Sequence, residues 1–334
     1  MESNKILVTG GAGYIGTHIA KNLLKEGFKV IILDNLSTGF IEPVQLLQKK
    51  YKTLEFIKGD LADKDLLKKI FSKNIEAVIH LAAKVNVRES IQQPDIYTRE
   101  NYLNSINLVE TMVSRGVNKL VFSSTCAVYG EPKYIPIDEQ HPTKPINPYS
   151  QTKLDFENYL EKVKNLQFLI FRFFNVGGSD PEGLIGKAHL INPDLTENIM
   201  EVALDQRDHL EIFGDDYNTE DGTPVRDYIH VEDISQAHIS GLKNLKKLDG
   251  EIINLGSEKG FSVKEVIITA ENVIRKTIPI KMGQRKEGDV ACSVASAKKA
   301  KDMFGWQPQY SNLGTIIETD WKWRRKHPAG YLKK

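Results

Sequence analysis

Short apolar segments alternate with stretches of helical periodicity through the first half of the chain. The segments that predict strands are Lys5–Thr9, Lys29–Leu33, Leu54–Ile57, Ala77–His80, Lys119–Ser123 and Phe168–Phe173. Short strands separated by helical patterns of about 10 to 20 residues are typical of βαβ units, whose strands run parallel and whose helices cover the sheet. The pattern therefore predicts an α/β fold built on a doubly wound parallel sheet.

The character of the chain changes near its middle. Glycine and proline become frequent, and the later candidate strands, Leu210–Phe213 and Ile252–Leu255, are short and scattered. A chain of 334 residues is long enough for one large α/β unit or for two packed domains. We predict a nucleotide-binding domain over residues 1–175, to which about 228–256 return, and a smaller C-terminal α/β domain, mainly residues 176–334, that binds substrate.

The overall composition argues against several classes of protein. Lys and Arg number 45 against 44 Asp and Glu, so the chain has no basic field that would attract nucleic acid or a membrane surface. Its two cysteines lie far apart and its eight histidines form no cluster, so we expect neither a disulfide framework nor a metal site. No 18-residue apolar window occurs, and we expect a cytoplasmic protein.

A glycine-rich turn follows the first predicted strand. Gly10, Gly13 and Gly16 form a Gly-x-x-Gly-x-x-Gly pattern, and a helical run begins at Tyr14 and Ile15. Glycines so spaced permit a tight turn, close approach of a pyrophosphate to the backbone, and close packing of the helix on the strand. The alternative is a glycine cluster in an ordinary turn.

An acidic residue ends the second predicted strand, eighteen positions after the last of these glycines. The Asp34 carboxylate can accept both hydroxyls of an adenosine ribose there, as in a Rossmann dinucleotide-binding domain. An acid repels a 2′-phosphate and no arginine occurs in residues 35–39, so the sequence favours NAD over NADP. Asp60 and Leu61 are placed to reach the adenine, although Asp60 is equally well placed to cap a helix over Asp63–Phe71.

Tyr149 and Lys153 form a Tyr-x-x-x-Lys pair at the start of a predicted helix. Residues four apart share one helix face, so the phenol and the ammonium can converge on one reacting atom. A general base at pH 7 requires the tyrosine pKa to fall from about 10 to near 7, which costs roughly 4 kcal/mol. We expect Lys153 and an oxidised nicotinamide ring to lower it. The same spacing also occurs on ordinary solvated helices.

The fifth predicted strand runs into Ser123, Ser124 and Thr125. A hydroxyl at the carboxyl end of a parallel strand lies where such sheets bind ligands, and it can hold a substrate oxygen. Turn formation is the ordinary alternative for these residue types. With the tyrosine and lysine, Thr125 completes the predicted catalytic set.

These motifs resemble the extended short-chain dehydrogenases/reductases, and within them the UDP-glucose (UDP-galactose) 4-epimerase branch. The resemblance covers nearly the whole chain, through residues 9–16, 34–36, 59–60, 81–84, 123–125, 128–130, 148–153 and 171–175. Its most specific part is residues 212–231, which include Gly214-Asp215-Asp216-Tyr217 and Arg226-Asp227-Tyr228.

The resemblance implies a UDP-hexose 4-epimerase that retains NAD as a bound cofactor. Tyr149 would take the proton of the sugar 4-hydroxyl while C4 gives its hydride to NAD⁺, and Thr125 would hold the same oxygen. Lys153 would bind the nicotinamide ribose and lower the pKa of Tyr149. The 4-keto sugar would then rotate and receive the hydride on its other face. Further cofactor contacts would come from Asn35, Lys84 and Asn101.

The resemblance also implies a site for UDP. Its residues would be Asn175, the backbone at Leu195, Phe213 against the uracil, Arg226, Arg285 and Lys286 on phosphate, and Asp289 on ribose. Each has an ordinary alternative: Phe213 in a core, Arg226 paired with an acid, Asp289 in a turn.

Three positions depart from the family pattern. Lys286 stands where many members carry a second arginine, and lysine keeps the charge but not the bidentate grip on phosphate. Asp194 can cap a helix, but its charge is unfavourable near the expected diphosphate. Ser293 replaces a large side chain of many glucose-restricted members. It leaves room for a 2-acetamido group, which predicts that UDP-N-acetylglucosamine and UDP-N-acetylgalactosamine are also substrates.

Other functions on the same fold are alternatives. A nucleotide-sugar 4,6-dehydratase would need acids directly after Thr125, where this chain has Cys126 and Ala127. A uronate 4-epimerase would need an additional cation for the sugar carboxylate. A non-catalytic NAD-binding sensor would be expected to lose Tyr149 or Lys153, and both are present. From the resemblance we also expect a homodimer formed by a helix pair beside the Tyr149 helix.

Overall fold

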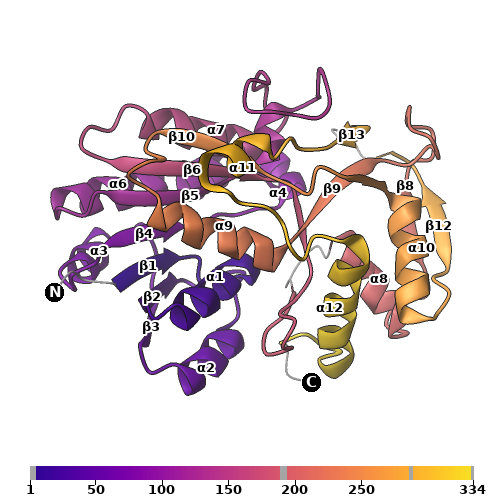
Figure 1. Ribbon diagram of the computed structural model, residues 1–334, viewed down its shortest axis with the longest axis horizontal. Helices are drawn as coiled ribbons and strands as arrows, with labels where there is room; N and C mark the ends of the chain where they lie inside the picture. The colour runs from indigo at the N-terminus through magenta and orange to yellow at the C-terminus, as the bar shows by residue number, and fades with distance from the viewer. Residues whose placement is uncertain (1–4, 189–193, 286–288, 332–334) are drawn as a thin grey trace. The chain divides into compact units, whose positions relative to one another are not determined.

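The structure is a computed structural model that describes residues 5–188, 194–285 and 289–331 (Figure 1). The chain forms two compact units. Unit 1 comprises Met1–Gly130, Thr143–Arg172 and Ser235–Ile253, and unit 2 comprises Glu131–Pro142, Phe173–Ile234 and Asn254–Lys334. No helix in the described ranges combines the length and the apolar character needed to cross a bilayer.

A seven-stranded sheet with the order β10-β6-β5-β4-β1-β2-β3 forms the centre of unit 1. Its strands are β1 (Lys5–Thr9), β2 (Lys29–Asp34), β3 (Leu54–Lys58), β4 (Ala77–His80), β5 (Lys119–Thr125), β6 (Gln167–Phe173) and β10 (Glu251–Leu255). The pairings of β1 with β2 and β4, of β2 with β3, and of β4 with β5 are parallel. The strand order reverses between β1 and β4, which is the position where doubly wound sheets bind ligands. The predicted doubly wound α/β sheet is confirmed.

Helices follow most of these strands in the chain. They are α1 (Tyr14–Lys25), α2 (Ile41–Lys50), α3 (Lys64–Phe71), α4 (Val87–Gln92), α5 (Pro94–Tyr97), the π-helix η1 (Thr98–Leu103), α6 (Asn104–Ser114), the 3₁₀ turn η2 (Cys126–Tyr129), α7 (Pro148–Leu160) and α9 (Val231–Lys243). Side-chain caps begin several of them. Asp63 accepts from two backbone N–H groups of α3, and Asn147 accepts from Ser150 N of α7 at 2.9 Å.

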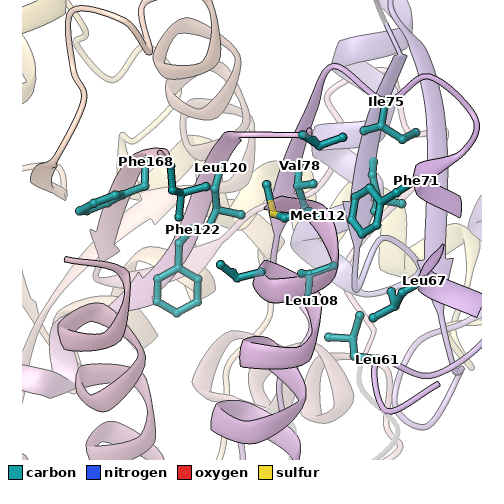
Figure 2. Packing of buried hydrophobic residues seen from close by; sticks show 14 of the residues in the cluster. Leu61, Leu67, Phe71, Ile75, Val78, Leu108, Met112, Leu120, Phe122 and Phe168 are labelled. Atoms are coloured by element: carbon teal, nitrogen blue, oxygen red, sulfur yellow. The ribbon is translucent and has the colours of Figure 1, made fainter. Parts of the chain in front are cut away.

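One hydrophobic core of unit 1 lies between the sheet and the helices α3 and α6. Figure 2 shows Leu67 of α3 and Leu108 and Met112 of α6 packed with Val78 and Leu120 of the sheet. All five side chains are fully buried. Burial of such side chains stabilises a fold by about 1.5–3 kcal/mol each, so this packing holds the strand ends that carry the site residues.

The described residues of unit 2 form two small sheets. In one, β9 (Val225–His230) pairs with β7 (Asn175–Gly177), β11 (Gly260–Ser262) and β13 (Cys292–Ser293); in the other, β8 (Leu210–Phe213) pairs with β12 (Ile280–Gly283). Its other helices are α8 (Leu195–Ala203), α10 (Val263–Ile274), α11 (Lys298–Phe304) and α12 (Leu313–Lys326). The apolar faces of α8, α10 and α12 share one core, which includes Ile199, Val266 and Ile316.

Candidate active site

The glycine turn between β1 and α1 is constrained by backbone packing at two positions. A Cβ on Gly10, whose φ is +69°, would lie 2.6 Å from Ala82 N, and a Cβ on Gly16 would lie 2.3 Å from Gly10 O. Both contacts are too short for any larger residue. Gly10 is therefore required by packing against the loop after β4, and Gly16 by packing within the turn.

The backbone constrains Gly13 less tightly than it constrains Gly10 and Gly16. Its φ of −76° is accessible to any residue, and its Cβ would come near only Gly10 O, at 3.2 Å. Gly13 is the N-cap of α1, whose first turn contains no acidic side chain. Bare backbone at a helix N-terminus, where N–H groups have no helical partner, is suited to an anion such as a pyrophosphate.

Asp34 lies at the end of β2, beside this turn. Its carboxylate accepts hydrogen bonds from Ala12 N at 3.0 Å and Leu36 N at 2.8 Å. Burial raises its pKa, and the two backbone hydrogen bonds oppose that rise. The carboxylate is therefore held in one orientation.

Asp60 is not a helix cap. Asp63 takes that role for α3, while Asp60 accepts from Asn35 Nδ2 at 2.7 Å and from Ala62 N at 2.9 Å. The side chains of Asn35 and Asp60 thus form one polar pair after β2 and β3, and the adjacent Leu61 is buried. The capping alternative raised by the sequence is wrong, because the helix begins one turn later than Asp60 would require.

Lys84 and Asn101 are joined through the backbone. Lys84 N donates to Asn101 Oδ1 at 2.7 Å, and Asn101 Nδ2 donates to Lys84 O at 2.9 Å. Lys84 Nζ forms an ion pair with Glu89 at 3.0 Å. Asn101 is buried, so its amide positions the loop after β4.

Thr125, Tyr149 and Lys153 converge at the carboxyl end of β5. The strand runs two residues further than predicted, so Thr125 is its last residue and its hydroxyl hydrogen-bonds with that of Tyr149. Lys153, one helical turn after Tyr149 on α7, donates from Nζ to Ser123 O at 2.8 Å. Its ammonium also lies 4.5 Å from the centre of the Phe122 ring. The three predicted catalytic side chains thus form one cluster.

The charges of this cluster differ from the sequence-based expectation. Part of the Tyr149 side chain is exposed, but burial of its hydroxyl raises its pKa to about 12, and the hydrogen bond from Thr125 opposes that rise. Burial lowers the pKa of Lys153 to about 7, and the negative charge of Glu157 opposes that change. The expected depression of the tyrosine pKa by Lys153 is therefore not produced by the protein groups. Desolvation of the Tyr149 hydroxyl outweighs the hydrogen bond from Thr125.

A buried ion pair supports the cluster from within unit 1, and sequence reasoning missed it. Glu157 of α7 pairs with Arg172 of β6, and both side chains are almost completely buried. The same carboxylate accepts from Ser124 Oγ. The signal in the sequence was an arginine within the otherwise apolar strand Phe168–Phe173, together with an acid four residues after Lys153 on one helix face.

The charged residues that were predicted to bind UDP lie in unit 2. Arg226 on β9 forms an ion pair with Asp289 and donates to Val225 O at 2.8 Å. Arg285 pairs with Asp216, and its guanidinium lies 4.0 Å from the centre of the Tyr217 ring. Lys286 lies outside the described residues. Arg226 thus pairs with an acid, as its ordinary alternative role required. That acid, Asp289, is itself one of the residues predicted to bind UDP.

The remaining predicted UDP residues are spread over four elements of unit 2. Asn175 opens β7 and is exposed, Leu195 opens α8, Phe213 ends β8 and is half-buried, and Ser293 lies on β13 in register with Arg226. Asp194 caps α8 and forms a reciprocal capping box with Glu197.

The charge of Asp194 has a local partner. The Lys187 ammonium, which is almost fully buried, pairs with the Asp194 carboxylate and donates to Thr196 Oγ1 at 3.2 Å. The Asp194 charge, which we expected to be unfavourable near the diphosphate, is thus paired with a cation within unit 2. No group of three or more His, Cys, Asp or Glu side chains suited to a metal ion occurs among the described residues.

Comparison with known proteins decides the family. The family model described as the NAD dependent epimerase/dehydratase family matches residues 6–256. The chain belongs to this family. Among its relatives, the UDP-glucose 4-epimerase of Halalkalibacterium halodurans is 45% identical over 332 residues, 98% of this chain and 97% of that protein.

Solved structures of such epimerases share the fold over the full length. A crystal structure of a UDP-glucose 4-epimerase matches with a TM-score of 0.93 and 44% identity, covering 98% of this chain and 100% of that chain. The UDP-glucose 4-epimerase of Bifidobacterium longum, solved in complex with NAD⁺ and UDP, matches with a TM-score of 0.92 and 34% identity, covering 98% and 99%. The resemblance to 4-epimerases that the motifs indicated is confirmed.

Unit 1 of this NAD dependent epimerase/dehydratase offers residues that fit NAD. Gly13 leaves bare backbone where a Cβ would otherwise project, and Asp34 presents a fixed carboxylate. Carboxylate oxygens accept from ribose hydroxyls, and helix N-termini bind pyrophosphate, so the two features match the two ends of an adenosine diphosphate group.

Proposed function

We propose that this chain interconverts UDP-glucose and UDP-galactose, with NAD as a bound cofactor. The observation that carries the proposal is the cluster of Thr125, Tyr149 and Lys153 at the carboxyl end of β5. It occurs in a chain that is 45% identical to a UDP-glucose 4-epimerase over nearly its full length.

In this proposal Tyr149 holds the proton that leaves and returns at the sugar 4-hydroxyl. Thr125 Oγ1 accepts from Ala127 N at 3.1 Å, so its own hydrogen is directed to Tyr149 or to the substrate oxygen. Lys153 supplies a positive charge beside the phenol and is oriented by Ser123 O. Bound NAD would supply the hydride acceptor for C4 and the donor for its return.

A positive charge is needed because burial raises the pKa of Tyr149 to about 12. One unit charge at about 6 Å contributes roughly 3 kcal/mol at an effective dielectric constant near 20. The base is therefore strengthened when Lys153 is protonated and the cofactor is oxidised. Proton removal by Tyr149 is thus favoured in the oxidising half of the cycle.

In unit 2 we assign the uridine diphosphate to Asn175, Leu195, Phe213, Arg226, Arg285, Lys286 and Asp289. Support comes from the two arginines, which provide bidentate donors for phosphate oxygens. The ion pairs that Arg226 and Arg285 form with Asp289 and Asp216 hold the guanidinium groups in place before ligand binds.

Incubation with UDP-galactose, without added reductant, tests the proposal. We expect UDP-glucose as the product and a loss of about 10²–10⁴-fold in kcat for Tyr149→Phe. NAD that stays bound without turnover would instead indicate a sensor. Turnover of UDP-glucuronate but not UDP-galactose would indicate a uronate 4-epimerase.

We further propose that N-acetylated UDP-hexosamines are substrates, because Ser293 is small and lies in register with Arg226. Ser293→Tyr should lower kcat/KM for UDP-N-acetylglucosamine by at least about 10-fold and leave that for UDP-glucose within about twofold. Negligible turnover of the acetamido sugars by both the wild type and the variant would refute this substrate range.

We also propose a cytoplasmic homodimer. Val85, Ile91 and Leu103, in and beside α4 and η1, are about half exposed, and an apolar surface of this kind suits a second copy of the chain. The two cysteines are free thiols, which suits a reducing compartment. Sedimentation velocity should give a dimer for the wild type and a monomer for Ile91→Asp; a monomeric wild type would refute the dimer.

A further inference from the structure

The hydroxyl of Tyr217 in unit 2 is buried and has no hydrogen-bond partner among the described residues. The side chain is only 6% exposed. Buried polar groups in folded proteins almost always have a partner, and an exception calls for a specific explanation such as a ligand. The proposed catalytic cycle gives this hydroxyl no role.

The surroundings of Tyr217 are the charged residues of the proposed nucleotide site. Burial raises the pKa of Tyr217, the charge of Asp289 raises it further, and the charges of Arg285 and Arg226 oppose this. The guanidinium carbon of Arg285 lies over the Tyr217 ring, 4.0 Å from its centre. The Tyr217 side chain therefore belongs to the same cluster as the two arginines that we propose to bind phosphate.

Gly214 leaves room for the Arg285 guanidinium to lie over the Tyr217 ring. Gly214 has a φ of +90°, and a Cβ there would lie 2.6 Å from Arg285 Cγ and 2.7 Å from Tyr217 Cε2. The loop that carries the tyrosine is closed by a hydrogen bond from Tyr217 N to Gly222 O at 2.9 Å. Ring and guanidinium are thus held together by the local backbone before any ligand binds.

The neighbouring carboxylates already have other partners. Asp289 accepts from Arg226, and Asp216 accepts from Arg285. The tyrosine hydroxyl thus remains a donor beside two cations whose charge would attract an anion. Phosphate oxygens are strong acceptors for such a donor.

We propose that the Tyr217 hydroxyl donates a hydrogen bond to the diphosphate of the UDP-sugar, between Arg226 and Arg285. This inference rests on the proposed function, because it assigns a further residue to the same nucleotide site. Tyr217 is then a binding residue for the phosphates, with no part in proton or hydride transfer.

The test is Tyr217→Phe, which removes one oxygen and keeps the ring under Arg285. We expect the Kd for UDP, measured by titration calorimetry, to rise about 10-fold, because a hydrogen bond to a charged group is lost. KM for the UDP-sugar should rise in parallel, with kcat within about twofold. The Kd for uridine, which lacks phosphates, should not change.

Thermal stability separates a ligand contact from a structural one. Removal of an unpaired buried hydroxyl should leave Tm unchanged or raise it, whereas removal of a structural hydrogen bond would lower it. Tyr310→Phe, at a tyrosine that is 40% exposed in the same unit, is the matched control and should change neither Kd nor Tm.

The outcomes are distinguishable. A wild-type protein that does not bind UDP would refute the proposed function. A wild type that binds UDP, with an unchanged Kd in Tyr217→Phe, would refute only the role of Tyr217. An equal rise in Kd for uridine and for UDP would show that Tyr217 contacts the nucleoside, and it would refute the contact with phosphate.

Discussion

At the scale of single residues, the site combines groups whose burial works against their charged forms. Burial raises the pKa of Tyr149 to about 12 and lowers that of Lys153 to about 7. Both changes favour the neutral form of the side chain. Burial of these two groups therefore lowers the stability of the folded protein, but it provides the water-excluded, pre-organised site that a polar reaction needs.

The cost of Lys153 can be measured. Its pKa in the folded protein, about 7, lies below its ordinary value of 10.5, so between these pH values the unfolded chain binds more protons. The contribution of Lys153 to stability is therefore lowest below pH 7 and recovers as the pH rises towards 10.5. Lys153→Met should abolish turnover and raise Tm by about 2 °C or more at pH 6, with a smaller gain at pH 10.

Differential scanning fluorimetry of both proteins across this pH range is the measurement. An equal gain in Tm at pH 6 and pH 10 would contradict the explanation, because a packing effect does not depend on the protonation of the lysine.

At the scale of elements, caps and strand ends position the chemistry. The Asn147 side chain caps α7 two residues before Tyr149, and Thr125 is the last residue of β5. Loss of a cap usually costs about 1 kcal/mol and frays the first helical turn. On α7 that turn carries the reacting phenol.

Asn147→Ala should therefore lower the free energy of unfolding by about 1 kcal/mol and lower kcat by about 10-fold, through misplacement of Tyr149. Asp63→Ala is the matched control, because Asp63 caps α3 with hydrogen bonds to Asp65 N and Leu66 N. It should cost similar stability and leave kcat unchanged. A similar fall in kcat for both variants would show that stability alone was responsible.

At the scale of the whole molecule, the two units contain buried groups that respond to acid in opposite ways. In unit 1, burial lowers the pKa of His80 to about 3 from 6.5. In unit 2, burial raises the pKa of Asp227 and of Asp320 to about 6 from 3.8. Protonation of a buried histidine places a charge in the interior and destabilises the folded state. Protonation of a buried carboxylate removes a charge from the interior and stabilises it.

Acid should therefore weaken unit 1 first. Between pH 6.5 and 3 the unfolded state of unit 1 binds an extra proton at His80. The stability of folded unit 1 therefore falls as the pH is lowered through this range. Between pH 6 and 3.8 the folded state of unit 2 binds extra protons at its two aspartates, so their contribution rises. Hydrogen exchange read by mass spectrometry at pH-corrected times should show β4 and β5 losing protection before β9. The reverse order would contradict this assignment.

Much of the architecture could be predicted from short-range patterns. The apolar segments that alternate with helices specified the strands to within one or two residues, because sheet burial selects apolar side chains locally. The spacing of Gly10, Gly13 and Gly16 with Asp34 indicated the dinucleotide site for the same local reason. Tyr149 and Lys153 were found because one helical turn separates them.

Tertiary structure alone decided the charges and partners of these residues. The pairing of Glu157 with Arg172, of Arg226 with Asp289 and of Lys187 with Asp194 depends on which chain segments meet. The burial that raises the pKa of Tyr149 and lowers that of Lys153 depends on the same long-range contacts. The sequence by itself determined the α/β sheet, the glycine turn and the residue types of the site, since these depend on neighbours in the chain. Only the folded chain decided solvation and long-range pairing, because both depend on atoms contributed by distant segments.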